Sequence, residues 1–205
     1  MITIVDYGIG NLNSVANMIR HVGGECRITG DRDEIAGAEK LLLPGVGAFD
    51  RGMEALRESG IADALSVAVL EKGVPTLGIC LGMQLMTKRS EEGHLPGLGW
   101  LDAEVVKFRF RADSGLKIPH MGWNTLSILR DNPLILPEER QRFYFVHSYY
   151  VVCADESDVT ATCDYGCDFV AAFARGNIFG AQFHPEKSHR FGMAVMRNFL
   201  EMIPC

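Results

Sequence analysis

The stretch Val74–Met86, VPTLGICLGMQLM, joins an apolar run to a helix-forming segment through a cysteine flanked by glycines. The apolar run before Gly78 is typical of a strand buried on both faces of a parallel sheet. Gly78 and Gly82 frame Cys80, which gives the form G-x-nucleophile-x-G between a strand and a helix. Small neighbours allow the sharp turn that presents a nucleophile above a sheet, and the helix N-terminus lowers the pKa of a thiol. The alternative is a structural cysteine that fills a gap in a glycine-rich bend.

The segments around this stretch predict the fold. Short strand patterns at 2–6, 25–29 and 40–47 alternate with helical patterns at Leu12–Val22, Phe49–Leu56 and Ile61–Leu70. This order predicts a doubly wound α/β fold with a mostly parallel sheet. Later segments read mostly as strands and predict an antiparallel extension, closed by a helix. The strand patterns lie around Ala103–Phe110, Thr125–Leu129, Phe143–Cys153 and Phe169–Phe183, and the helix at Phe191–Met202.

Composition limits the kinds of function to consider. The 205 residues are 47% hydrophobic and 22% charged, which fits one globular domain spanning residues 1–205. A net charge of −6 argues against nucleic acid as a partner, because phosphate binding requires a basic face. The N-terminus lacks a signal-peptide pattern, and no apolar run reaches membrane-spanning length. We therefore expect a cytoplasmic protein with no membrane partner.

Metal and nucleotide sites are not expected. Cys163 and Cys167 form a C-x3-C pair, but two further ligands at matching spacing are missing, so the six cysteines are expected to be reduced thiols. The opening segment 7–13, YGIGNLN, departs from the dinucleotide fingerprint at Asn13, where a glycine is needed. The chain is expected to need no cofactor.

A nucleophile requires a base, and His184 is the best candidate. It follows an apolar strand pattern and therefore lies at the strand end where α/β sheets place their chemistry. Glu186, two residues on, could accept a hydrogen bond from the imidazole and fix its tautomer. The alternative is a solvated surface turn, HPEK.

The segment Leu43–Gly47, LPGVG, follows another strand. Its glycines leave backbone N–H groups free to face a ligand, and the N–H of Leu81 could supply a second donor to an oxyanion. A plain β-turn is the alternative.

Together these segments resemble the class I glutamine amidotransferases. GICLGMQ, the upstream PGVGAF and the late QFHPEKS match that family's three motif regions in order. The segments 118–124 (IPHMGWN) and 143–149 (FYFVHSY) are similar to the glutaminase subunits of imidazole glycerol phosphate synthase, in histidine biosynthesis. The resemblance covers nearly the whole chain and implies a flavodoxin-like sheet.

The resemblance also implies residue roles. Cys80 would be the nucleophile, His184 the general base and acid, and Glu186 the orienting carboxylate. The segment around Gly45 would be the oxyanion strand. Val46 and Gly47 would belong to the same oxyanion strand. Glutamine would be bound by Gln84, Glu92, Ser148 and Tyr149. The partner would be contacted by Trp123, Tyr144 and Lys187.

The implied reaction is hydrolysis of L-glutamine to glutamate and ammonia, with ammonia passed to a cyclase subunit that has a (β/α)8 barrel in a heterodimer. One alternative is ammonia supply to a sugar amidation pathway for surface polysaccharide, which uses the same half-reaction. Two others are a cysteine hydrolase of esters or peptides, and a binding domain with an inactive site.

Overall fold

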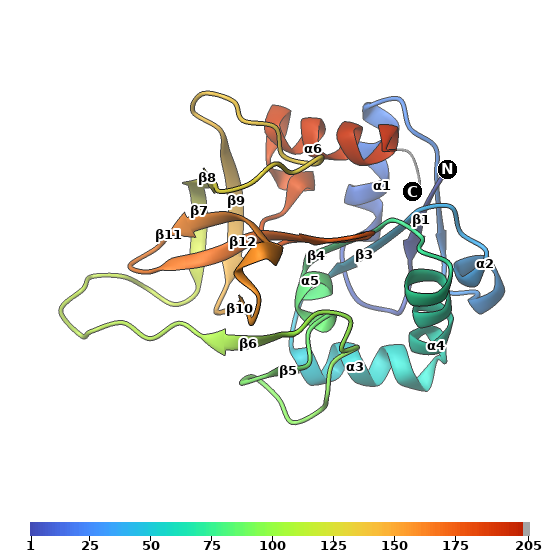
Figure 1. The fold of residues 1–205 in the computed structure, drawn as a ribbon, viewed down its shortest axis with the longest axis horizontal. Coiled ribbons are helices and arrows are strands. Elements are labelled where there is room, and N and C mark those ends of the chain that lie inside the picture. The colour runs from blue at the N-terminus through green and yellow to red at the C-terminus, as the bar shows by residue number, and fades with distance from the viewer. Residues whose placement is uncertain (203–205) are drawn as a thin grey trace.

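The computed structural model describes residues 1–202, so Cys205 lies outside the described residues. A central sheet carries helices on both faces, and its antiparallel strands project away from them (Figure 1). A separate two-stranded sheet pairs β7 (His120–Thr125) with β9 (Arg142–His147).

The first half of the main sheet is parallel, in the order β2-β1-β3-β4-β13. The strand β4 lies between β3 and β13, which are far apart in sequence, so residues from both reach its carboxyl end. The strands are β1 (Ile2–Val5), β2 (Cys26–Thr29), β3 (Leu41–Gly45), β4 (Thr76–Cys80) and β13 (Ile178–Ala181).

Apolar side chains alternate between the two faces of this sheet, as the twofold period of a strand requires. In β3, Leu41 and Leu43 pack on one face and Leu42 on the other. Helices α1 (Leu12–His21) and α6 (His189–Glu201) cover the face of Leu42. The opposite face is covered by α2 (Arg32–Ala36), α3 (Phe49–Glu58) and α4 (Ile61–Ser66).

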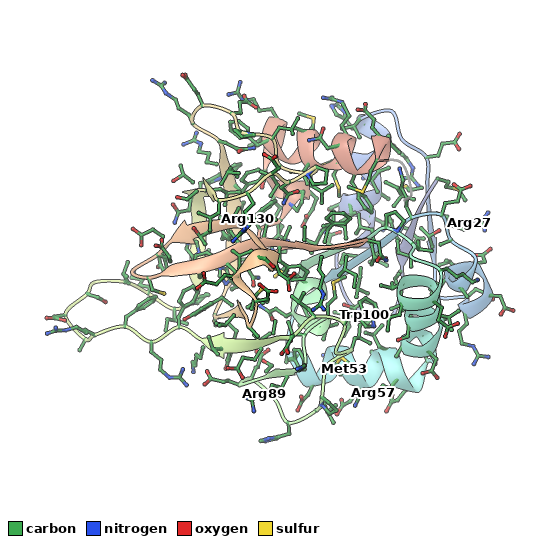
Figure 2. The ribbon with its side chains drawn as sticks, in the orientation of Figure 1. Arg27, Met53, Arg57, Arg89, Trp100 and Arg130 are labelled. Carbon is green, nitrogen blue, oxygen red and sulfur yellow. The ribbon has the colours of Figure 1, made fainter. Side chains whose placement is uncertain are left out.

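Side chains between the sheet and its helices are buried, and those on the outer surface are exposed (Figure 2). Met53 of α3 and Trp100 are buried in the core beneath the sheet, whereas Arg27, Arg89 and Arg130 are exposed.

The antiparallel extension follows β13 in the order β12-β10-β6, and the short β5 pairs parallel with β6 at the edge. Two further strands branch from β12, since β11 pairs with it and β8 pairs with β11. Their bounds are β5 (Arg89–Ser90), β6 (Ala103–Lys107), β8 (Ser127–Ile128), β10 (Tyr149–Cys153), β11 (Val159–Asp164) and β12 (Asp168–Arg175).

The structure refines several predicted segments. The strand pattern at 143–153 divides at Ser148, because β9 pairs with β7 while β10 joins the main sheet. The pattern at 169–183 is a hairpin that turns at Gly176, whose φ is +57°. The helix predicted to reach Leu70 ends at Ser66 and continues as a π-helical turn at Val67–Glu71. The sequence patterns did not predict α2, β5, β7 or β11.

Candidate active site

Cys80 occupies the turn between β4 and the short helix α5 (Leu81–Leu85). Its φ of 54° and ψ of −109° are values that only glycine adopts without strain. The flanking glycines are required by packing: a Cβ on Gly78 would lie 2.7 Å from the backbone nitrogen of Met83, and one on Gly82 would overlap the carbonyl oxygen of Leu43. The thiol is 7% exposed and lines a cavity.

His184 and Glu186 lie beside this turn, at the start of the 3-10 turn Pro185–Lys187 that follows β13. The His184 Nδ1 lies 2.8 Å from Glu186 Oε1, and both side chains are almost completely buried. Because a carboxylate only accepts, Nδ1 carries the hydrogen. This leaves Nε2, which is buried and makes no hydrogen bond of standard geometry, as the ring atom free for proton exchange.

The electrostatics of the three side chains favour a charged imidazole. Burial lowers the pKa of His184, but hydrogen-bond attraction to the Cys80 thiol and the Glu186 carboxylate, together with their charges, outweighs burial and raises it to about 9. Burial also raises the pKa of the nearby Tyr7 hydroxyl, and a charge on Cys80 raises it further. The imidazole of His184 is therefore favoured in its protonated form at neutral pH.

The segment predicted as an oxyanion strand lies directly beside the cysteine. Gly45 is the β3 partner of Cys80 across the sheet. Val46 and Gly47 line the same cavity, and Gly47 has a φ of +111°. The Tyr7 hydroxyl donates to the Pro44 carbonyl oxygen at 2.9 Å and fixes the start of this segment.

The second predicted donor is the N–H of Leu81. Leu81 is the first residue of α5, so its N–H belongs to the first turn, whose N–H groups have no partner within the helix.

A cavity of about 460 Å³ opens above Cys80. The four residues predicted to bind glutamine all line it: Gln84, Glu92, Ser148 and Tyr149. Glu92 is held in place because its Oε2 accepts the N–H of Phe49 at 2.9 Å. The volume and the mixture of an apolar wall with carboxylate, amide and hydroxyl groups suit a small polar molecule.

The structure adds residues that sequence reasoning missed. His147 lines the cavity, and its Nδ1 donates to the Tyr149 carbonyl oxygen at 2.9 Å. The His147 Nε2 lies 3.1 Å from His120 Nδ1 in a buried pair. Gln182 is completely buried and contacts Cys80. His120 and His147 fall within segments already quoted for their family resemblance, but only the pairing of β7 with β9 brings them together.

The residues predicted to contact a partner form one surface cluster. Trp123 and Tyr144 are paired across β7 and β9, with ring centroids 6.1 Å apart. The Lys187 ammonium lies 5.6 Å from the Tyr144 ring centroid, and His189 stacks on Trp123. We call Trp123, Tyr144, Lys187 and His189 the hairpin cluster.

Within residues 1–202, no group of three or more His, Cys, Asp or Glu side chains could hold a metal ion. No helix in the same range is long and apolar enough to cross a bilayer.

Comparisons identify the class of protein to which this fold and site belong. The family glutamine amidotransferase class-I matches residues 3–203, and the chain belongs to that family. Solved structures share the fold. One is a putative GMP synthase protein from Thermoplasma acidophilum, with a TM-score of 0.72 and 23% identity over 97% of this chain and 91% of that one. PurLQS from Thermotoga maritima has a TM-score of 0.71 and 21% identity over 97% and 96%.

Within the class, the chain is similar over its whole length to one particular protein, subunit HisH of imidazole glycerol phosphate synthase. It is 52% identical to HisH 2 of Pseudomonas aeruginosa, over 99% of this chain and 100% of that protein. It is 48% identical to HisH of Leptospira interrogans, over 98% and 100%. The predicted fold class and family are thus confirmed.

Proposed function

We propose that this chain hydrolyses L-glutamine to glutamate and ammonia, with Cys80, His184 and Glu186 as its catalytic residues. The observation that carries the proposal is the position of a strained cysteine beside a buried, carboxylate-oriented imidazole. A cavity of about 460 Å³ gives a small substrate access to the sulfur.

The chemistry follows from these positions. The Cys80 thiolate attacks the side-chain carboxamide carbon of glutamine, and the carbonyl oxygen becomes an oxyanion. The His184 Nε2–H protonates the leaving nitrogen, which departs as ammonia and leaves a thioester. His184 Nε2 then takes a proton from water, and the resulting hydroxide cleaves the thioester to glutamate and regenerates the thiolate. Glu186 keeps the ring in the required tautomer throughout.

The oxyanion takes its hydrogen bonds from the backbone. The Leu81 N–H lies at the start of α5, and the Gly45–Gly47 segment supplies a second donor. Removal of one such donor typically lowers the rate by a factor of about 10²–10³. Because Gly47 permits large rotations, a partner that reorients this segment would change turnover by a similar factor.

Substrate recognition is shared between two sides of the cavity. Both amide hydrogens of Gln84 are already used, by the Tyr149 carbonyl and by Gln182, so Gln84 offers only its Oε1 to the substrate, as an acceptor. The Glu92 carboxylate supplies a charge complementary to the substrate's α-ammonium group. Ser148 and Tyr149 line the same cavity, and the Tyr149 carbonyl accepts the hydrogen bond from Gln84.

Ammonia released into water at neutral pH becomes mostly ammonium, which is not a nucleophile, so a synthetic enzyme must pass it on directly. The relatives are named as subunits of imidazole glycerol phosphate synthase, which supports another subunit of that synthase as the partner in a heterodimer. We propose that this partner is the cyclase and that it has a (β/α)8 barrel. The contact surface in this proposal is the hairpin cluster together with Val46, which is exposed and lines the cavity.

We also propose that the 205 residues form one domain that acts in the cytoplasm. The main sheet takes strands from residues 2 to 181, and α6 packs on α1, which supports one domain. The described cysteines are all free thiols, which supports a reducing compartment.

The test uses the Cys80→Ser variant in the complete complex. We expect it to abolish glutamine-dependent synthesis while ammonia-dependent synthesis by the cyclase continues. Cys26→Ser, a conservative change at another free cysteine, serves as the matched control and should retain both activities. Glutamine-dependent turnover by Cys80→Ser would contradict the proposal. Activity only with a sugar amidotransferase as partner would support the glutaminase but replace the pathway.

A further inference from the structure

Gln182 is a polar side chain in the otherwise apolar segment 178–183, IFGAQF. It follows β13 directly, and because Ala181 pairs with Ile79, Gln182 reaches the position beside Cys80. Its side chain is 0% exposed. Burial of an amide is costly unless the amide is hydrogen-bonded, so the partners of Gln182 define what it can do.

The hydrogen bonds of Gln182 have a fixed direction. The Tyr149 carbonyl oxygen can only accept, and it lies 3.1 Å from Gln84 Nε2, so the NH₂ of Gln84 points there. The second hydrogen of that NH₂ goes to Gln182 Oε1 at 3.0 Å. Gln182 therefore turns its own NH₂ toward Cys80, and its Nε2 lies 3.7 Å from the sulfur.

A donor aimed at sulfur stabilises the thiolate more than the thiol, because the charged form accepts the stronger hydrogen bond. We propose that Gln182 takes part in the glutaminase reaction by donating its Nε2–H to the Cys80 sulfur, and that Gln84 sets the direction of that bond. This inference rests on the proposed function of Cys80. It assigns Gln84 a second task, because one amide both borders the substrate cavity and orients the donor to the nucleophile.

The direct test is the pH dependence of Cys80 alkylation by iodoacetamide, followed by mass spectrometry of the Cys80 peptide. The reagent reacts with the thiolate, so the rate reports the thiolate fraction. The titratable groups that surround the sulfur are unchanged in each Gln182 variant, and they are Tyr7, His184, Glu186 and the cavity-lining Glu92 and His147. Gln182→Met removes the donor and keeps the length of the side chain. Gln182→Glu still accepts from Gln84 but places a negative charge beside the sulfur.

We expect the Gln182→Met profile to move up by about one pH unit, which is a tenfold slower reaction on the acid side. Gln182→Glu should move it further. The matched control is Gln141→Met, at a buried glutamine whose amide donates to the Leu136 carbonyl outside the cavity, and it should leave the profile unchanged. kcat/KM for glutamine should fall with Gln182→Met and recover partly at higher pH.

An unchanged alkylation profile in folded Gln182→Met would overturn the inference. If that variant does not fold, Gln182→Asn, whose amide is too short to reach the sulfur, carries the same expectation. The outcome also separates the two proposals. A shifted profile in a chain that does not hydrolyse glutamine keeps the donor role and removes the function, whereas normal hydrolysis with an unshifted profile removes only the donor role.

Discussion

Replacement of Cys80 by glycine should stabilise the protein relative to replacement by alanine, although both remove the thiol. At φ 54° and ψ −109°, any residue with a Cβ is strained by about 1–3 kcal/mol. Alanine keeps that strain and glycine removes it. Glycine in turn costs about 0.5–1 kcal/mol in the conformational entropy of the unfolded chain. The difference in unfolding free energy should therefore favour Cys80→Gly by about 1 kcal/mol.

The assay is urea unfolding of the two variants, with thermal unfolding as a second measurement. A difference of 1 kcal/mol corresponds to about 2–4 °C in Tm for a chain of this size. The matched control is Cys26, a free cysteine in the regular strand β2. There, the glycine variant should be the less stable of the pair, by about 0.5–1 kcal/mol. If Cys80→Gly is also less stable than Cys80→Ala, the turn is not strained and the reasoning fails.

Two further predictions follow from the charges in the site. His184→Ala should lower kcat/KM for glutamine by a factor of about 10²–10⁴. Glu186→Gln should lower it by less, because in the proposed mechanism the carboxylate orients the imidazole and does not transfer the proton. Steady-state glutamate release measures both variants, and a larger loss in Glu186→Gln than in His184→Ala would contradict the assigned roles. Burial lowers the pKa of His120 to about 4 and that of His147 to about 3, so the unfolded chain binds up to two more protons than the folded one between pH 6 and 4. The free energy of unfolding should therefore decrease as the pH is lowered through this range, by up to about 2.7 kcal/mol per pH unit from this pair. His147→Asn should reduce that slope by about half in urea titrations, and an equal slope in both proteins would show that the pair does not titrate this way.

Much of the parallel half could be predicted because its signals are local. Apolar runs, amphipathic spacing and the glycines around Cys80 each occupy a few consecutive residues. The antiparallel half was harder, because Phe143–Cys153 reads as one strand and only tertiary pairing divides it at Ser148. The strand β7 carries His120, Gly122 and Trp123 in a pattern without clear alternation, and it was missed.

In the site, too, only residues with a local sequence pattern could be predicted. His184 and Glu186 stand out because a histidine at a strand end followed by a carboxylate is a readable pattern. Gln182 lies two residues away and was missed, because a single glutamine in an apolar strand has no periodic or motif signal. The role of Gln182 depends on hydrogen bonds that involve Gln84 and Tyr149, and these residues come together only in the folded structure.

The insertion of β13 beside β4 has a consequence for biosynthesis of the chain. Ribosomes complete residue 80 about a hundred residues before His184 exists. Under the proposed mechanism, a shorter nascent polypeptide carries the sulfur without its imidazole and cannot hydrolyse glutamine. The order of the strands therefore delays reactivity until β13 and the turn that follows it have been synthesised.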